Sequence, residues 1–148
     1  MLSFLVGPPL TVGTPAPDFT LRDQDGSPVT LSKLRGQNVV LIFYPADETP
    51  VCRKQLCEFR DSADVWKGKN TVVFGVNPSS AGSHASFRRN QSLGFPLLVD
   101  EDKVVSKLYR TKGLVVTRRT VYLIGPDGKI RYAQRGKPDP AEVLAATV

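Results

Sequence analysis

The stretch that decides the fold reads Asn38-Val-Val-Leu-Ile-Phe-Tyr44, then Pro45-Ala-Asp-Glu-Thr49, then Pro50-Val-Cys52-Arg-Lys-Gln-Leu-Cys57. Its first part is a continuous apolar run that stops at a proline, which indicates a strand buried on both faces. Its last part begins a helix expected to reach about Trp66, because Thr49 can serve as N-cap and a proline is tolerated at the first helical position. A second apolar run, Thr71 to Val76, completes a βαβ unit with parallel strands.

The rest of the chain predicts a mixed sheet with helices on both faces. The other expected elements are an N-terminal β-hairpin with strands at 18–21 and 29–31 around Asp25-Gly26, a helix at 83–93 capped by Ser83, a short strand at 97–99, a helix at 102–109, a hairpin with strands at 120–124 and 129–134, and a last helix capped by Asp139. With 148 residues and no linker or repeat, the chain is expected to form a single α/β domain, residues 1–148.

Cys52 and Cys57 are the only cysteines, so any thiol chemistry belongs to them. They are expected near the C-terminal end of the first central strand, where α/β sheets bind their ligands. Five helical residues give a rise of about 7.5 Å and a rotation of about 140°, which places the two Cα atoms roughly 8–9 Å apart. A disulfide needs a Cα separation below about 7 Å, so the pair can bond only if the helix unwinds.

Cys52 is expected to be the more reactive of the two thiols. It lies in the first turn of the helix, where backbone N–H groups lack intrahelical partners and favour a thiolate. Lowering a thiol from about 8.5 to about 6 takes roughly 3.4 kcal/mol, whereas a helix terminus supplies at most about 2 kcal/mol. A nearby cation is therefore needed. Arg118 or Arg119 could supply it from the strand that follows, and strand alternation alone does not decide between them.

Several polar or aromatic residues have a structural interpretation that we favour over a functional one. Trp66 belongs to the apolar face of the helix, although it could stack a ligand. His84, near the start of the next helix, is expected to be a surface or capping-turn residue. Arg60 and Asp61 are expected to pair with each other or with the sheet.

The charge is unevenly distributed, since residues 103–137 hold ten Lys or Arg against one acid, Asp127. This basic segment could attract an acidic protein or a nucleic acid, but no nucleic-acid motif accompanies it, so a solvated surface is the expected interpretation. The first ten residues lack the basic region and length of a secretory signal, and no stretch is long and apolar enough to cross a membrane. We expect a cytoplasmic protein, a compartment where a cysteine pair is more often catalytic than structural.

An ordered set of motifs runs along nearly the whole chain. It consists of Gly13-Thr-Pro-Ala-Pro-Asp-Phe-Thr-Leu21, Pro45-x-x-x-Thr49-x-x-Cys52 with Cys57 five residues on, Phe59-Arg-Asp61, Ser83-His-x-x-Phe87, Phe95-Pro-Leu-Leu-x-Asp100, and Arg119-Thr-Val-Tyr-Leu-Ile-Gly-Pro-Asp-Gly128. In this set the sequence resembles the peroxiredoxins, and within them the bacterioferritin-comigratory-protein or Q type. The chain departs from the type at Val51, Arg53 and Gln55, where glycine, threonine and glutamate are usual.

The resemblance implies a thioredoxin-like fold and a peroxidase that reduces hydrogen peroxide and organic hydroperoxides. Cys52 corresponds to the peroxidatic cysteine and Cys57 to the resolving cysteine. Thr49 corresponds to the hydroxyl that orients the peroxide, Arg119 to the active-site arginine and Pro45 to the residue that shields the pocket. Together with Val51, these three residues would bind the substrate. The implied cycle forms a sulfenic acid on Cys52, then an intramolecular disulfide that a thioredoxin or glutaredoxin-like protein reduces, so a monomer suffices.

Two other classes of function remain open. A thioredoxin-like thiol-disulfide oxidoreductase normally uses Cys-x-x-Cys, which is absent here. A non-enzymatic binding protein could use the basic segment instead. We expect no metal or other cofactor, because two cysteines and the single His84 are too few soft ligands for a tetrahedral zinc site.

Overall fold

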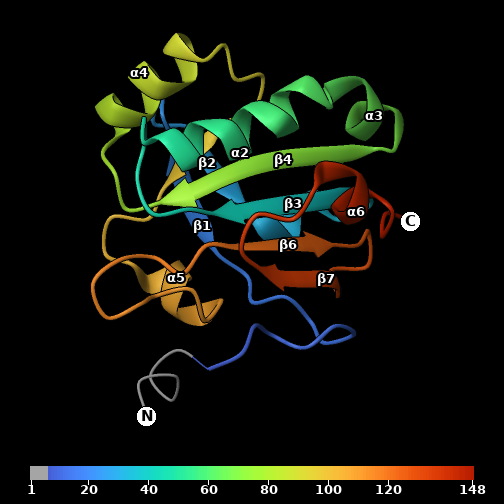
Figure 1. Cartoon of the computed structure of the whole chain (residues 1–148). Helices are drawn as coiled ribbons and strands as arrows, with labels where there is room; N and C mark the ends of the chain where they lie inside the picture. Colours follow the sequence, from blue (N-terminus) through green and yellow to red (C-terminus); the bar gives the residue numbers. More distant parts are fainter. Residues whose placement is uncertain (1–6) are drawn as a thin grey trace.

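The computed structural model describes residues 7–148, and the described chain forms a seven-stranded sheet in the order β2-β1-β5-β4-β3-β6-β7 (Figure 1). Its strands are β1 (Thr20–Asp23), β2 (Pro28–Thr30), β3 (Asn38–Phe43), β4 (Thr71–Asn77), β5 (Leu97–Val99), β6 (Thr120–Ile124) and β7 (Ile130–Arg135). Its helices are the 3-10 helix η1 (Leu31–Leu34), α2 (Pro50–Asp61), α3 (Ala63–Gly68), α4 (Ala81–Asn90), α5 (Val104–Leu108) and α6 (Pro140–Leu144). Residues 1–6 of the opening segment considered above for targeting lie outside the described residues.

The predicted βαβ unit forms the centre of the sheet. β3 pairs in parallel with β4, and all six residues of β3 are buried. Alternate residues of β3 serve two separate cores: Val40 and Ile42 pack under α2, while Val39, Leu41 and Phe43 pack on the opposite face. A strand with both faces covered must be apolar throughout, which explains the uninterrupted run in the sequence.

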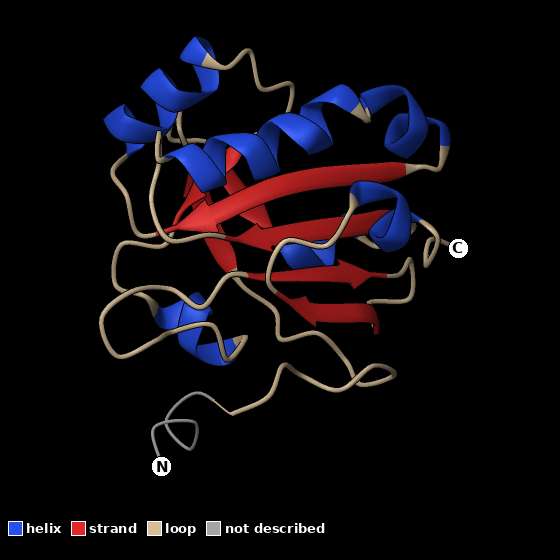
Figure 2. Ribbon diagram, viewed as in Figure 1, coloured by secondary structure: helices blue, strands red, loops and turns tan. Residues whose placement is uncertain are grey.

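Helices cover both faces of the sheet, as predicted (Figure 2). One core contains buried residues of α2, α3, α4 and α6, and the other contains those of η1 and α5. The predicted hairpins are also present, since β1 pairs antiparallel with β2 and β6 with β7. β1 lies between β2 and β5 and also pairs antiparallel with β5, which makes the sheet mixed.

The expected helix from Pro50 to Trp66 is in fact two helices that meet at Ser62. The Ser62 hydroxyl donates a hydrogen bond to the Glu58 carbonyl at 2.9 Å, and its N–H bonds the Phe59 carbonyl. Serine competes for backbone groups in this way and is a poor residue for a helix interior. Trp66 nevertheless lies in the core, as expected, with its Nε1 donating to the Phe59 carbonyl at 2.8 Å.

The prediction that Ser83 caps the next helix was wrong. The N-cap of α4 is Ser80, whose hydroxyl accepts a hydrogen bond from the Ser83 N–H at 3.1 Å. Serine fits both positions, so the sequence alone could not choose between them. The Asp139 cap was correct, because its carboxylate accepts from the Ala141 N–H at 3.0 Å.

Other boundaries shift by a few residues. The first strand was expected at 18–21 but runs over 20–23, because the Asp18 carboxylate instead accepts hydrogen bonds from the N–H groups of Phe19 and Ser32. The second strand ends one residue early, where η1 begins. The helix expected at 102–109 covers 104–108, and the strand expected at 129–134 covers 130–135.

The basic segment, residues 103–137, is partly occupied by contacts within the protein. Arg131 pairs with Asp127, Lys137 with Glu58, and Arg135 donates to the Thr120 hydroxyl and the Gly7 carbonyl. These contacts reduce the charge that is free to face a partner. In the described part of the chain, none of the helices has the length and apolarity needed to cross a bilayer.

Candidate active site

Cys52 lies in the first turn of α2, which follows the C-terminal end of β3. The loop from Tyr44 to Thr49 joins the two elements, and Cys52 is the third residue of the helix. Its side chain is almost fully buried, with 1% of the residue exposed. The chain enters the helix as predicted, since the Thr49 carbonyl accepts the Arg53 N–H at 2.8 Å.

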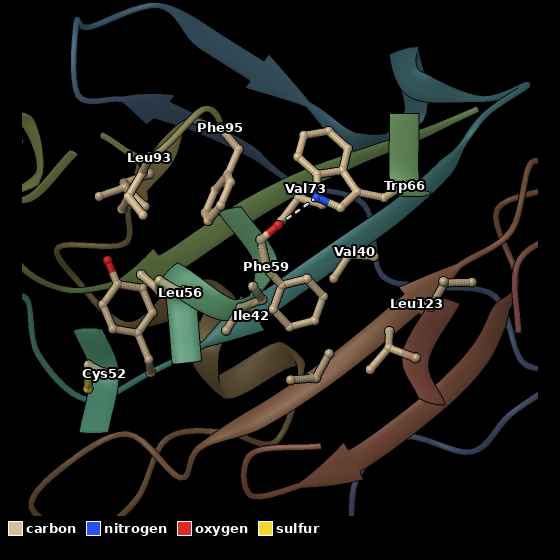
Figure 3. Packing of buried hydrophobic residues seen from close by; sticks show 14 of the residues in the cluster. Val40, Ile42, Cys52, Leu56, Phe59, Trp66, Val73, Leu93, Phe95 and Leu123 are labelled. Atoms are coloured by element: carbon tan, nitrogen blue, oxygen red, sulfur yellow. Dashed lines mark hydrogen bonds between the residues drawn. The ribbon is translucent and has the colours of Figure 1, made fainter. Parts of the chain in front are cut away.

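The core beneath α2 fixes the height of Cys52 above the sheet. Leu56 and Phe59 are fully buried and lie on the same side of the helix as Cys52 (Figure 3). They pack over Val40 and Ile42 of β3, so the helix cannot rotate without exposing apolar surface. The spacing of four and seven residues from Cys52 is the one that shares a helical face.

Arg119 provides the cation that the sequence required. It precedes β6, and its Nη2 donates a hydrogen bond to the Cys52 sulfur at 3.2 Å. Arg118 is exposed, so the structure turns Arg119 and not Arg118 toward the thiol. The contact places a guanidinium charge directly against the buried sulfur.

Gln55, which differs from the glutamate usual in the Q type, belongs to this site. Its side-chain carbonyl accepts from Arg119 Nη1 at 2.7 Å, so one guanidinium bridges Gln55 and Cys52. The Gln55 amide is neutral, and none of the ion pairs among the described residues involves Arg119. The Gln55 Nε2 is buried without a partner among residues 7–148.

Thr49, Pro45 and Val51 surround the helix entrance. Thr49 has extended N-cap dihedrals, but its hydroxyl donates to the Ala46 carbonyl at 3.3 Å and makes no cap hydrogen bond, so the side-chain part of the cap prediction was wrong. Thr49 is exposed as a residue. Pro45 is half-buried, and 53% of Val51 is exposed next to Cys52.

Cys57 has different surroundings. It is half-buried and donates a hydrogen bond to the side-chain carbonyl of Gln91, the C-cap of α4, at 3.6 Å. The main-chain carbonyl of Gln91 accepts Arg60 Nη1 at 2.5 Å. Arg60 also pairs with Asp61, as predicted. Both cysteines are free thiols on an unbroken stretch of α2, which is the arrangement expected when the two are not bonded.

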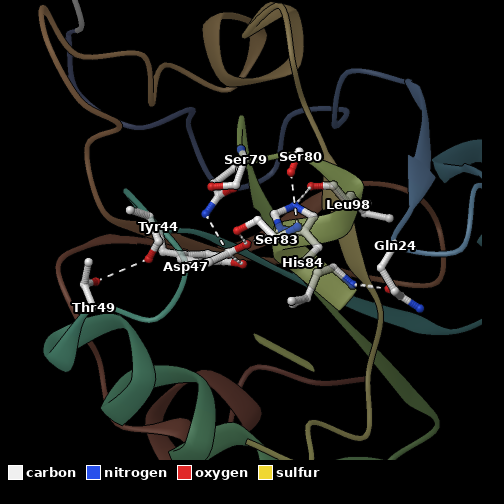
Figure 4. Close-up of polar contacts among 12 residues, drawn as sticks. Gln24, Tyr44, Asp47, Thr49, Ser79, Ser80, Ser83, His84 and Leu98 are labelled. Carbon is white, nitrogen blue, oxygen red and sulfur yellow. Dashed lines mark hydrogen bonds and ion pairs between the residues drawn. The ribbon is translucent and has the colours of Figure 1, made fainter. Parts of the chain in front are cut away.

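A buried carboxylate, Asp47, ties the loop before α2 to two other elements, β4 and α4 (Figure 4). Its Oδ1 accepts the Tyr44 hydroxyl at 2.7 Å and the Asn77 amide at 3.2 Å. Its Oδ2 accepts the Ser83 hydroxyl at 2.8 Å and lies 2.6 Å from His84 Nδ1. Burial alone would raise the pKa of Asp47, but the hydrogen bonds from His84, Tyr44 and Ser83 outweigh it and lower that pKa.

The expectation that His84 is a surface residue was wrong, because its side chain is fully buried. Its Nε2 lies 2.8 Å from the Leu98 carbonyl, which can only accept, and its Nδ1 faces the Asp47 carboxylate. No local pattern indicates this burial, since His84 and Asp47 are 37 positions apart in the chain. Burial and the Asp47 carboxylate raise the pKa of the neighbouring Tyr44 well above its ordinary value, so its hydroxyl stays a donor.

The chain belongs to the AhpC/TSA family, whose model matches residues 12–133. Its similarity is to peroxiredoxins of the Q type, which confirms the resemblance drawn from the sequence. Peroxiredoxin Q, chloroplastic, of Oryza sativa subsp. japonica is 41% identical over 140 residues, covering 92% of this chain and 64% of the relative. The protein of the same name from Sedum lineare is 38% identical, covering 94% of this chain and 76% of the relative. The chain thus spans just under two thirds of the length of several curated relatives.

Solved structures agree with the sequence relatives. Peroxidoxin BcpB from Mycobacterium tuberculosis superposes with a TM-score of 0.87 at 30% identity, covering 93% of this chain and 96% of the other. A cysteine-to-serine mutant of PrxQ from Xylella fastidiosa gives 0.86 at 30% identity, covering 94% and 96%. The fold is therefore the thioredoxin-like fold of these peroxiredoxins, as predicted.

Proposed function

We propose that this protein is a thiol-dependent peroxidase and that Cys52 is its peroxidatic cysteine. The observation that carries the proposal is the hydrogen bond from Arg119 to a buried sulfur in the first turn of α2. A thiolate is a strong nucleophile, and here its charge is stabilised by a guanidinium and a helix N-terminus. Membership of the AhpC/TSA family supports the same chemistry.

The first step forms a bond between the Cys52 sulfur and the nearer peroxide oxygen while the O–O bond breaks. The sulfur is oxidised to sulfenic acid, and the departing oxygen takes up a proton to leave as water or an alcohol. Negative charge moves from sulfur onto that oxygen during the step. Arg119 and the Thr49 hydroxyl are within the same helix entrance and would stabilise the oxygen, with Pro45 and Val51 at its border.

In the second step the Cys57 thiol attacks the sulfenic sulfur, forming a disulfide and releasing water. The first turns of α2 must open for this step, because a helix holds residues five apart too far apart to bond. An external dithiol protein of the thioredoxin or glutaredoxin type then exchanges with the disulfide and restores both thiols. Because both cysteines lie on one chain, we propose that the active protein is a monomer. A cycle that must regenerate thiols also favours the reducing cytoplasm.

Steady-state peroxide consumption with a thioredoxin system tests the proposal. Cys52→Ser should abolish turnover, whereas Cys57→Ser should consume a single equivalent of peroxide and then stop. Hydrogen peroxide and an organic hydroperoxide are compared in the same assay. Normal turnover by Cys52→Ser would refute the assignment, and reduction of insulin disulfides without peroxide would favour the thioredoxin-like alternative.

A further inference from the structure

The network around Asp47 and His84 is not used by the chemistry described above, yet it holds the loop that enters the active site. Asp47 lies two residues before Thr49 and five before Cys52. Its side chain has 2% exposure and that of His84 has none. The partners belong to β4, α4 and, through Leu98, β5, so one carboxylate fastens the loop to three elements.

Both members of the pair have hydrogen-bond partners on every polar side-chain atom. His84 Nε2 donates to the Leu98 carbonyl, which can only accept, and His84 Nδ1 lies 2.6 Å from Asp47 Oδ2. Each Asp47 oxygen takes part in two hydrogen bonds. A buried pair that is fully hydrogen-bonded is costly to break.

The loop beyond Asp47 is shaped by this attachment. Glu48 has φ +64, a left-handed conformation that a non-glycine residue adopts only when its surroundings hold it there. The Glu48 carboxylate accepts the Asn90 amide of α4 at 2.9 Å. The chain then turns into Thr49 and the first turn of α2, which bear the groups around the sulfur.

We propose that Asp47, locked by His84, is a positioning residue for the peroxide step. It holds the loop so that Thr49 and the first-turn N–H groups lie next to Cys52. When α2 opens, it keeps the chain up to residue 47 in place. Asp47 has no hydrogen bond to either cysteine, and it lies in the loop that precedes Cys52, whereas Cys57 follows Cys52 in the body of α2. It therefore acts on sulfenic acid formation and not on the attack by Cys57. The inference rests on the proposed peroxidase function.

The key comparison is between Asp47→Ala and Asp47→Asn. The alanine removes all four hydrogen bonds. The asparagine keeps them, because its carbonyl can accept from Tyr44 and Asn77 while its amide donates to a neutral His84 and to Ser83. Asp100→Ala is the matched control: Asp100 is an equally buried carboxylate that accepts three hydrogen bonds at the start of α5.

The experiment measures sulfenic acid formation and disulfide formation separately by rapid mixing, at a temperature where each variant is folded. We expect Asp47→Ala to slow the first step by about 10- to 100-fold, the usual effect of a misplaced catalytic group, and to leave the second within about 3-fold. Asp47→Asn should restore the first step to within about 3-fold of wild type. Asp100→Ala should lower the melting temperature without slowing either step.

Two milder variants keep the test decisive if Asp47→Ala does not fold. Tyr44→Phe and Ser83→Ala each remove one hydrogen bond to Asp47, and each should slow the first step alone. An unchanged rate of sulfenic acid formation in these two variants, or equal slowing of sulfenic acid formation and disulfide formation, would overturn the inference. It would also be overturned if Asp47→Asn formed sulfenic acid as slowly as Asp47→Ala.

A separate readout distinguishes this inference from the proposed function. Amide hydrogen exchange in the unreacted protein should rise at Val51 to Arg53 in Asp47→Ala and stay unchanged at Cys57 to Arg60. If wild-type protein fails to react with peroxide, the proposed function fails, while the exchange pattern still decides whether Asp47 holds the loop. Uniform exchange along α2 in both proteins would overturn it.

Discussion

Replacing Arg119 by methionine removes the cation that donates a hydrogen bond to the Cys52 sulfur. The lost contact is a charge-assisted hydrogen bond of 3.2 Å to a buried atom. Such a bond contributes about 1.5–3 kcal/mol. If the bond supports the thiolate throughout the reaction, its loss slows sulfenic acid formation by about 10- to 150-fold.

The same substitution also affects stability, because Gln55 loses its one partner. The Gln55 Nε2 already lacks a hydrogen bond within the described region, and after the substitution the Gln55 side-chain carbonyl lacks one as well. An unsatisfied buried group costs about 1–3 kcal/mol of unfolding free energy. For a domain of this size each kcal/mol lowers the melting temperature by about 2–4 °C.

Stopped-flow measurement of the peroxide reaction, with thiolate absorbance followed against pH, checks this prediction. Arg118→Met is the matched control, since it removes an equal charge from an exposed neighbour. Arg119→Lys keeps the charge but offers a single donor group, so it should recover part of the rate. If Arg118→Met and Arg119→Met slow the reaction equally, or if the order is reversed, the role assigned to Arg119 is refuted.

Three further predictions concern neighbouring groups. Gln91→Ala removes a weak hydrogen bond from the Cys57 thiol. Disulfide formation should therefore be faster by about 2- to 5-fold in a single-turnover assay. Slower disulfide formation would show instead that Gln91 orients the thiol for attack. Gln55→Glu should raise the melting temperature, because it replaces the side-chain nitrogen that lacks a hydrogen-bond partner. The same substitution should lower the thiolate fraction of Cys52, because a carboxylate at this position neutralises Arg119. An unchanged thiolate fraction would contradict this account. The pKa of Asp47 is lowered by folding, so its contribution to stability is present above the unfolded value of about 3.9 and is lost as the pH falls through the folded value. Urea titrations below about pH 4 should therefore show a smaller loss of unfolding free energy for Asp47→Asn than for wild type, and parallel curves would contradict the lowered pKa of Asp47.

The sequence predicts the framework of the fold because buried strands and capped helices leave local patterns. The apolar run of β3 and the Asp139 cap are examples in which every interaction that decides the element is close in sequence. Boundaries were harder, because Ser80 and Ser83 are equally good caps and only the attraction of Ser83 to Asp47 separates them. The break at Ser62 depends on a hydroxyl that competes with the helix, which composition does not reveal.

The residues of the candidate site also fall into those that the sequence predicts and those that it does not. The cysteines and Arg119 could be found from motifs and from the need for a cation, and the structure brings Arg119 to Cys52. His84 could not, because its burial is decided by Asp47 on a distant loop. A lone histidine on a polar helix gives no signal of a buried partner.

Intact mass under non-reducing conditions tests the central claim most directly. The reduced protein is mixed with one equivalent of peroxide, and the reaction is stopped with a thiol-blocking reagent. The intact mass is then measured by mass spectrometry. The account predicts a monomer that has lost the mass of two hydrogen atoms and takes up no blocking reagent. Cys57→Ser should instead retain one added oxygen atom on Cys52. A wild-type protein that keeps both thiols free after peroxide treatment, or that becomes a disulfide-linked dimer, would contradict the account.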